Sequence, residues 1–169
     1  MKSATIRTGD AGDLDALLAI YNHYVEHSDA TFDVRRATTE ERGVWLSRYA
    51  AHTRYQLLVA QAEGDVLGYA TSSPYRPHPA FEHTVETSVY VHPEAKRQGV
   101  GGRLYDALLD RLHDTDIHLA VAAVALPNDG SVALHRSRGF REVGTFTEYA
   151  VKGNRWISST WFERRIARD

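Results

Sequence analysis

A basic, glycine-rich stretch near the middle of the sequence has residue types that suit a bound phosphate. Lys96, Arg97 and Gln98 directly precede Gly99-Val100-Gly101-Gly102, and Arg103 adds a further positive charge. Glycines let backbone N–H groups approach a ligand closely, and the first turn of a helix has unpaired N–H groups beside the positive end of the helix dipole. The stretch therefore favours a phosphate or pyrophosphate site. A solvated turn that needs glycine only for its backbone angles is the alternative.

Two common nucleotide-binding loops do not fit this stretch. The pattern GxxxxGK[ST] requires Lys and then Ser or Thr after the glycines, and no such pair follows Gly102. The pattern GxGxxG has Leu104 where its last glycine should stand. A phosphate at this place must therefore be bound by a loop of another class.

The patterns on either side predict the elements that position the stretch. Thr84 to Val91 alternates strictly, so its valines share one face of a strand and Glu86 lies on the opposite face. Apolar residues from Leu104 to Leu112 recur at helical spacing. Thr38 and Glu41 fit a capping box that opens another helix, and SSPYRPHPAF, with three of the five prolines, is typical of a loop.

The whole chain predicts the order strand-helix-helix-strand-strand-strand-helix-strand-helix-strand-strand, which is typical of a mixed sheet with helices on its faces. Glu63-Gly64-Asp65 predicts a hairpin turn between two of the strands. The predicted strands are Ala4 to Arg7, Tyr55 to Ala62, Val66 to Thr71, Thr84 to Val91, Ile117 to Val124, Arg141 to Thr147 and Trp156 to Glu163, and the predicted helices are Asp13 to Tyr24, the segment that opens at Thr38, Gly101 to His113 and Ser131 to Ser137.

Length and composition favour one globular domain over residues 1–169, with 43% hydrophobic and 25% charged residues. A formal net charge of −2 gives no reason to expect nucleic acid or an anionic membrane as a partner. No apolar run approaches the roughly 20 residues that span a bilayer, and MKSATIRTGD lacks the apolar segment of a secretory signal. The absence of cysteine excludes disulfides and thiolate chemistry. We expect a cytoplasmic protein without a metal site, because His23 and His27 occur without an HExxH motif.

The glycine-rich stretch resembles the acetyl-CoA loop of the GNAT superfamily of N-acetyltransferases. The family pattern Gln/Arg-x-x-Gly-x-Gly/Ala stands here as KRQGVG, with lysine in the first place. IYNHYVEHSDATFD, VETSVYVHPEAKRQGVG and ALPNDGSVALHRSRGF resemble the branch that contains phosphinothricin and methionine sulfone/sulfoximine acetyltransferases. The resemblance implies a GNAT fold, which is an α/β domain with a mixed, mostly antiparallel twisted sheet, a splay between the fourth and fifth strands, and helices on both faces.

The same resemblance implies an acetyl-CoA site, in which the pantetheine arm lies between the splayed strands like an extra strand. Asn128 would bond the pantetheine amide or carbonyl, and it also suits a helix N-cap, a role that is compatible with the first. The other residues implied to bind acetyl-CoA are Val89, Tyr90 and Val91 through their backbone groups, and Arg97, Gln98, Gly99, Val100, Gly101 and Gly102 around the pyrophosphate.

Acetyl transfer to an amine requires a neutral amine, whereas amines are mostly ammonium near pH 7. The resemblance implies that Glu86 is the general base that removes this proton. The structural alternative for Glu86 is a salt-bridged residue on the sheet surface. For His135, the resemblance implies an acid role toward the leaving CoA thiolate, and a surface or core histidine on a helix is the alternative.

At the acceptor end, SPYRPHPAF resembles the loop in which this branch meets the substrate's anionic groups. Arg76 matches that pattern, and its guanidinium suits a carboxylate or phosphinate. The second arginine of the pattern is His78 here. Phe32 is implied as an aromatic wall of the acceptor site, with a core phenylalanine as the alternative. KGNRW, from Lys152 to Trp156, is an altered form of the branch's K-F-G-x-W, which the family places at a homodimer interface and near the active site.

The function implied is transfer of acetyl from acetyl-CoA to the amine of a small amino-acid-like substrate. Two rival functions stay open. A peptide or protein N-terminal or lysine acetyltransferase would share the loop but needs an open groove, against which the proline-bounded loop around Arg76 argues. A noncatalytic acyl-CoA sensor would retain the loop without chemistry, against which the presence of both Glu86 and His135 argues.

Overall fold

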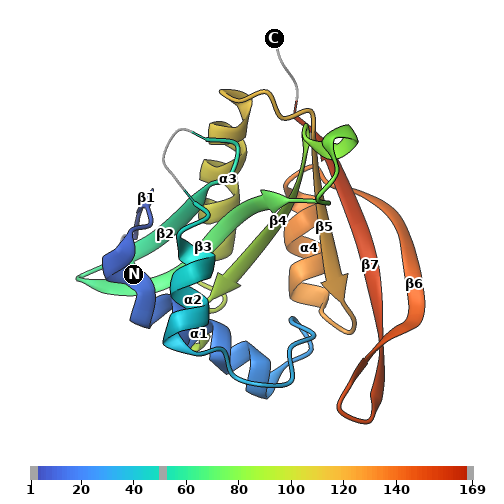
Figure 1. Cartoon of the computed structure of the whole chain (residues 1–169), viewed down its shortest axis with the longest axis horizontal. Coiled ribbons are helices and arrows are strands. Elements are labelled where there is room, and N and C mark those ends of the chain that lie inside the picture. The colour runs from blue at the N-terminus through green and yellow to red at the C-terminus, as the bar shows by residue number, and fades with distance from the viewer. Residues whose placement is uncertain (1–3, 50–52, 167–169) are drawn as a thin grey trace.

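The computed structural model describes residues 4–49 and 53–166, so the outer ends of the predicted domain, residues 1–3 and 167–169, lie outside the described residues. The strands of the described part are β1 (Thr5–Thr8), β2 (Leu57–Ala62), β3 (Asp65–Pro74), β4 (Thr84–Val91), β5 (Leu119–Ala125), β6 (Arg141–Lys152) and β7 (Arg155–Arg165). They form one sheet in the spatial order β1-β2-β3-β4-β5-β7-β6. Neighbouring strands are antiparallel except β4 and β5, which run parallel (Figure 1).

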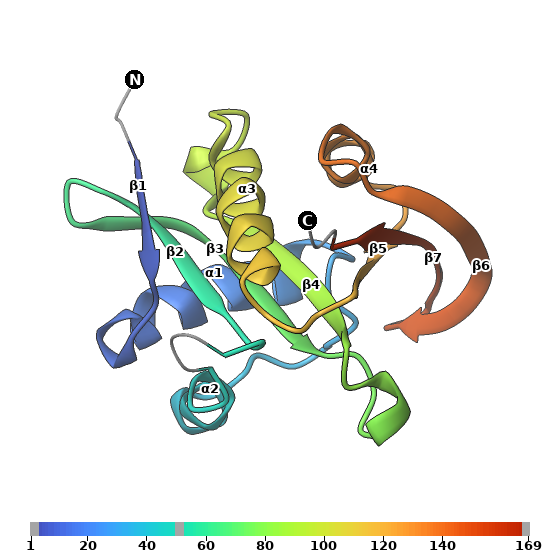
Figure 2. The ribbon, with the colours of Figure 1, turned by 90° about the horizontal axis from the view of Figure 1, so that it is seen from above.

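Helices cover both faces of this sheet, as predicted. The α-helices of the described residues are α1 (Leu14–His27), α2 (Thr39–Leu46), α3 (Val100–His113) and α4 (Asp129–Ser137). Figure 2 shows α1 and α2 on one face and α3 and α4 on the other. Short 3-10 turns at Ala11–Asp13, Pro79–Phe81 and Pro93–Ala95 were not predicted.

The sheet separates two hydrophobic cores. Leu57 and Val59 of β2 face α1 and pack with Leu17, whereas Leu58 and Ala60 face α3. The same alternation holds in β4, whose valines pack on the α3 side while Tyr90 packs on the α1 side. The predicted two-faced character of β4 is therefore confirmed.

Two local predictions are confirmed in detail. The Thr38 side chain accepts from the backbone N–H of Glu41, and the Glu41 side chain accepts from the N–H of Thr38, so the capping box opens α2. The turn between β2 and β3 is Glu63-Gly64, with φ values of 52° and 93°. Positive φ at both central residues matches the twist of a two-residue hairpin.

Several predicted boundaries are wrong. β3 continues through Ser72 to Pro74, which the proline content assigned to a loop, because these residues still pair with β4. β6 runs to Lys152 and β7 from Arg155 to Arg165, longer than predicted, since two register shifts let β6 stay paired past Thr147. Smaller shifts of one to three residues occur at the ends of β1, β2, β5, α1, α3 and α4 and at the start of β3.

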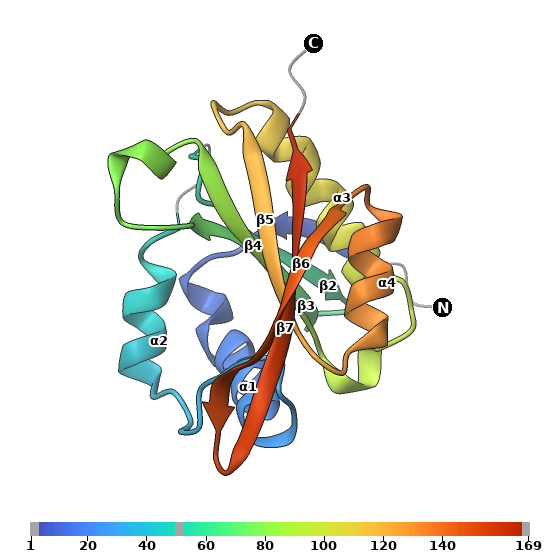
Figure 3. The same ribbon diagram turned by 90° about the vertical axis from the view of Figure 1, so that its right-hand side faces the viewer.

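The contact between β4 and β5 is short, and it decides where a ligand fits. Only Thr84, Val85 and Glu86 of β4 pair with β5, although β4 continues to Val91 and β5 to Ala125. Beyond Glu86 the two strands diverge. Figure 3 shows the tip of the β6–β7 hairpin beyond the end of β5, near α1. The splay predicted between the fourth and fifth strands is therefore confirmed.

Candidate active site

A cavity of about 780 Å³ follows the gap between the diverging strands. Backbone and side chains of β4 and β5 form its two sides, and the glycine-rich loop at the start of α3 forms one end. Of the acetyl-CoA-binding residues predicted from the sequence, the cavity is lined by Val89, Tyr90, Val91, Arg97, Gly99, Val100, Gly101, Gly102 and Asn128. The structure thus brings residues of β4, the glycine-rich loop, the first turn of α3 and the connection between β5 and α4 to one cavity.

The glycine loop has the backbone geometry of an anion site. Gly99 has φ 76° and serves as the N-cap of α3, and Arg97 also has a positive φ, of 62°. The first N–H groups of α3 have no acceptor within the helix and lie at its positive end, beside the cavity. A Cβ on Gly101 would meet Leu134 at 3.3 Å, so the loop and α4 approach closely here. The residues present therefore fit a pyrophosphate.

Charges around the loop are distributed differently from the sequence-based expectation. Lys96 and Arg97 line the cavity, with the Lys96 ammonium 5.0 Å above the ring of Tyr24. Arg103 instead donates to the backbone carbonyl of Ala4, so it is not placed to bind a phosphate. The Gln98 side chain donates to the carbonyl of Glu94 at 2.9 Å, which leaves its backbone as the part that can contact a ligand.

Glu86 lies at the point where β4 and β5 part. Its residue neighbours across the sheet are Ser73 on β3 and Val121 on β5. Burial raises the pKa of the Glu86 carboxyl, and no described residue forms an ion pair with it. A salt-bridged surface residue, the structural alternative, is therefore not what the described residues show. The carboxylate is half-buried and has no ion-pair partner among the described residues, and Glu86 directly precedes Thr87, which lines the cavity.

His135 is buried in the wall of the cavity and belongs to a hydrogen-bond chain. Its Nδ1 lies 2.7 Å from the carbonyl oxygen of Ser131, which can only accept, so Nδ1 carries the proton. The Tyr105 hydroxyl then donates to Nε2 at 2.7 Å, and Tyr105 Oη lies 3.0 Å from the Thr87 hydroxyl. Burial lowers the pKa of His135, which keeps the ring neutral. In this arrangement neither ring nitrogen has a spare proton for a leaving group.

Asn128 has the N-cap role expected of it, and its place in the cavity wall leaves the expected ligand-binding role open. Its side-chain oxygen accepts from the backbone N–H of Ser131 at 3.1 Å, so it is the N-cap of α4. It also lines the cavity at the end of β5. On β4, the Val91 carbonyl accepts from the Tyr24 hydroxyl at 2.7 Å, so a ligand would share that carbonyl with Tyr24.

The three residues predicted for the acceptor end lie outside the wall of this cavity. Arg76 is exposed, with its guanidinium carbon 5.0 Å from the ring of Tyr75 and 5.4 Å from that of Phe81. His78 caps a 3-10 turn by accepting from the N–H of Ala80. Phe32 is 40% exposed, so the alternative of a core phenylalanine is wrong.

Sequence reasoning missed one residue of the cavity wall, Tyr105, and one buried cation outside that wall, Arg42. Tyr105 lies on the buried face of α3, where a hydroxyl signals a polar partner. Arg42 of α2 is 5% exposed, stacks 3.3 Å from the Trp45 ring and donates to the Tyr69 hydroxyl at 2.7 Å. The sequence signal for this contact is the spacing of three residues between Arg42 and Trp45, which places the two side chains next to each other on a helix.

The described residues contain no group of three or more His, Cys, Asp or Glu side chains that could hold a metal ion. His23 and His27 lie with ring centroids 4.8 Å apart, and their neighbours do not complete such a group within the described ranges. None of the helices in the described part of the chain is long and apolar enough to cross a membrane.

The sequence model of the family described as "Acetyltransferase (GNAT) domain" matches residues 6–161. The phosphinothricin N-acetyltransferase of Streptomyces coelicolor is 46% identical over 163 residues, which are 95% of this chain and 95% of the relative. The L-methionine sulfoximine/L-methionine sulfone acetyltransferase of Salmonella typhimurium is 35% identical over 164 residues, which are 96% of this chain and 94% of the relative.

A solved structure has the same architecture with a ligand bound. It is a GNAT superfamily phosphinothricin acetyltransferase from Sinorhizobium meliloti in complex with acetyl-CoA, 31% identical, with a TM-score of 0.91 over 96% of this chain and 88% of that chain. The likeness covers the cavity described above, because the matched part spans nearly the whole chain.

Proposed function

Because this chain belongs to the GNAT family of acetyltransferases and is an acetyl-CoA-dependent N-acetyltransferase, we propose that its acceptor is the amine of a small amino-acid-like molecule. Phosphinothricin, methionine sulfone and methionine sulfoximine are the candidates, since related enzymes are named for them. We assign this activity to a single domain over residues 1–169. The observation that carries the proposal is the cavity between the parted strands β4 and β5, with the glycine loop at one end and Thr87, the residue after Glu86, in its wall.

In the proposed mechanism Glu86 acts as the general base. Directly or through a water, its carboxylate takes a proton from the acceptor's ammonium group and leaves a neutral amine. The amine nitrogen then attacks the carbonyl carbon of the thioester, a C–N bond forms and the C–S bond breaks. Burial supports this role, because a raised pKa brings a carboxylate closer to the strength that a base needs near neutral pH.

We propose that His135 acts on the leaving sulfur together with Tyr105. The nitrogen of the tetrahedral intermediate carries one proton more than the amide nitrogen of the product. The departing thiolate takes up one proton. A relay that moves this proton from nitrogen to sulfur therefore has no net gain or loss of protons. The Tyr105 hydroxyl would turn from Nε2 and give its proton to sulfur, and the resulting phenolate oxygen would receive one from the nitrogen through a water. Before and after this transfer, neutral His135 would accept from the Tyr105 hydroxyl through Nε2, which makes His135 a positioning residue in this scheme.

At the acceptor end we propose that Arg76 and His78 bind the substrate's anionic groups and that Phe32 forms an aromatic wall. The exposed position of Arg76 supports this role, because its guanidinium contacts only two aromatic rings and no carboxylate within the described residues. Phe32 is exposed but is fixed at one side by the ring of Tyr149, with centroids 6.0 Å apart.

An acceptor panel tests the proposed function. The purified protein is offered phosphinothricin, methionine sulfone, methionine sulfoximine, the common free amino acids and short peptides with a free N-terminus, and CoA release is followed by a thiol reagent. Acetylation of the free amino-acid analogues, with little on peptides, is the expected result. Preference for peptides would favour the rival N-terminal acetyltransferase. Binding of acetyl-CoA without turnover on any acceptor would favour the noncatalytic sensor.

We also propose that two copies of this chain associate through β6, which is an edge strand of the sheet. Val143, Phe146 and Tyr149 of β6 are 57%, 58% and 43% exposed, and an apolar edge strand of this length invites pairing with a partner. Sedimentation velocity should show a dimer that Phe146→Ser weakens. Val34→Ser is the matched control, since Val34 is 70% exposed and lies on the connection between α1 and α2. A wild-type monomer would refute the association.

We propose a cytoplasmic location, because acetyl-CoA is an intracellular metabolite and the activity depends on it. The formal net charge of −2 gives no reason to expect attraction to an anionic membrane surface. Fractionation of cells that express the protein should recover it with cytoplasmic markers, and recovery in the membrane or extracellular fraction would contradict the assignment.

A further inference from the structure

The β6–β7 hairpin ends in a pair of cations that face each other. Lys152 and Arg155 are direct cross-strand neighbours on either side of the turn Gly153-Asn154. Like charges at directly opposite positions destabilise an antiparallel pair. Burial lowers the pKa of Lys152, the negative charge of Asp29 opposes this shift, and the positive charge of Arg155 adds to it. Groups outside the hairpin are therefore needed to offset the repulsion between these two side chains.

Those groups belong to the residues that follow α1. The Lys152 ammonium donates to the carbonyl oxygens of Ser28 at 2.6 Å and Thr31 at 2.8 Å. Arg155 donates to both carboxylate oxygens of Asp29, at 2.9 and 2.6 Å, and the Asp29 side chain is only 16% exposed. The two cations thus bind one short segment, Ser28–Thr31, which is more than 120 residues away in the chain.

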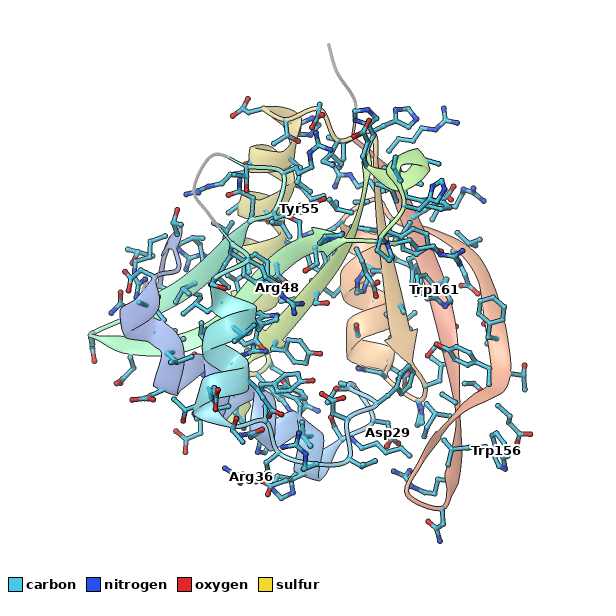
Figure 4. All side chains as sticks on the ribbon, in the orientation of Figure 1. Asp29, Arg36, Arg48, Tyr55, Trp156 and Trp161 are labelled. Carbon is cyan, nitrogen blue, oxygen red and sulfur yellow. The ribbon has the colours of Figure 1, made fainter. Side chains whose placement is uncertain are left out.

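The segment Ser28–Thr31 is part of the cavity wall. Ser28, Asp29 and Ala30 line the cavity, and Arg155 lines it with them. Figure 4 shows Asp29 on the connection after α1, beside the hairpin that carries Trp156. The next residue of the connection, Phe32, contacts Tyr149 of β6. The hairpin therefore holds this wall at more than one point.

The segment lies on the side of the sheet where an acceptor must approach. Glu86 shares its face of β4 with Tyr90, which packs on the α1 side, whereas the glycine loop and His135 belong to α3 and α4 on the other side. A general base must reach the amine whose proton it takes. The amine is therefore expected on the α1 side, next to the residues that follow α1.

We propose that Lys152 and Arg155 are positioning residues for the acceptor, which hold Ser28–Thr31 in place as the acceptor-side wall of the cavity. They do so without contacting the reacting atoms. The inference rests on the proposed acetyltransferase function, and it gives the altered KGNRW stretch a role that differs from dimer contact. The loop between α1 and α2 has a second, separate attachment, because Asn22 bonds both the N–H and the carbonyl of Ala37.

Three variants test the clamp. Lys152→Gln and Arg155→Gln each remove one cation, and Arg36→Gln is the matched control. Arg36 lies on the same connection and forms an exposed two-bond pair with Glu26, at 2.9 Å for each bond, away from the hairpin (Figure 4). We expect the KM for the acceptor to rise about three- to tenfold in the first two variants, while kcat and the Kd for acetyl-CoA change less than about twofold. Arg36→Gln should leave all three constants unchanged.

A conservative variant separates positioning from simple presence of charge. Arg155→Lys retains the charge but lacks the planar fork that binds both oxygens of Asp29. We expect its acceptor KM to fall between that of the wild type and that of Arg155→Gln. Equal weakening of acceptor and acetyl-CoA in the Gln variants would overturn the inference, because it would mean that the clamp supports the cavity as a whole.

Amide hydrogen exchange tests the clamp without turnover. Residues 28–33 should exchange faster in Lys152→Gln and Arg155→Gln than in the wild type, and at the wild-type rate in Arg36→Gln. Unchanged exchange in all variants would overturn the inference even if the enzyme is active. A wild-type protein that acetylates no acceptor would overturn the proposed function instead, so the two failures are distinguishable.

Discussion

Glu86 and Val121 form the last residue pair of the parallel ladder between β4 and β5. From the next residue on, β4 stays paired with β3 but borders the cavity instead of β5, and Thr87 is its first lining residue. The proposed base therefore stands where the sheet opens, on the face covered by α1 and α2. A register slip of one residue in β4 would move this carboxylate to the opposite face.

Replacing Glu86 by Gln keeps the shape of the side chain and removes the base. We expect kcat to fall by about 10²-fold or more near pH 7, because the acceptor then arrives mostly as ammonium. Raising the pH should restore part of the rate, since more of the amine is already neutral. Initial rates from pH 6 to 10 check this, and a variant that matches the wild type throughout that range would show that the base lies elsewhere.

The same substitution should increase stability at neutral pH. Burial raises the folded-state pKa of Glu86 above its unfolded value, so the folded state binds this proton more tightly. Ionisation therefore reduces stability as the pH rises from the unfolded pKa through the folded one. Glu86→Gln has no charge to bury, so its Tm should exceed that of the wild type at pH 7 and the difference should shrink toward pH 4. A lower Tm for the variant at pH 7 would contradict this account.

A side chain at Gly101 should interfere with acetyl-CoA. Its Cβ would meet Leu134 at 3.3 Å and Val91 at 3.5 Å, and the rest of a valine would extend into the lined cavity. We expect Gly101→Val to weaken acetyl-CoA binding by at least tenfold, or roughly 1.4 kcal/mol, in isothermal titration. Gly144→Val is the control, since nothing lies within 4 Å of a Cβ there. Unchanged affinity in a folded Gly101→Val protein would refute the assignment of this loop.

The Tyr105 hydroxyl should set the proton state of His135. It donates to Nε2 of the neutral ring, so Tyr105→Phe removes a bond that favours the neutral form, and the pKa of His135 should rise. Ring ¹⁵N NMR should find the proton on Nδ1 in the wild type and a higher pKa in the variant. The lost bond should also reduce the free energy of unfolding by about 1 kcal/mol. A wild-type ring protonated on Nε2 would contradict the hydrogen-bond chain.

Arg76 should discriminate charged from uncharged acceptors. If its guanidinium binds the acceptor's anionic group, then Arg76→Ala should lower kcat/KM for a free amino acid by about tenfold or more, because a charged partner is lost. The Kd for acetyl-CoA and the rate with an uncharged amine of similar size should change little. Equal losses for both acceptors would indicate that Arg76 supports the fold.

The local elements of this protein could be predicted from the sequence because they depend on neighbours only a few residues apart. Three features are formed within such short windows: the alternation of β4, the capping box of Thr38 and Glu41, and the turn at Gly64. The glycine loop is a further case, since its backbone angles and free N–H groups arise within one turn of helix. Long strands with irregular pairing were predicted less well, because β6 stays in the sheet only through β7.

Contacts between distant parts of the chain were decided by the tertiary structure. Sheet order determines that β4 and β5 part after Glu86, and the packing of α3 against α4 joins Tyr105 to His135, 30 residues apart. Lys152 contacts Ser28, which is 124 residues away in the chain, and a periodic pattern in the sequence cannot predict a contact over such a separation. Local sequence therefore determined which residues could do chemistry. The order of strands and the packing of helices determined which of them meet, because side chains are brought together only when the whole sheet has formed.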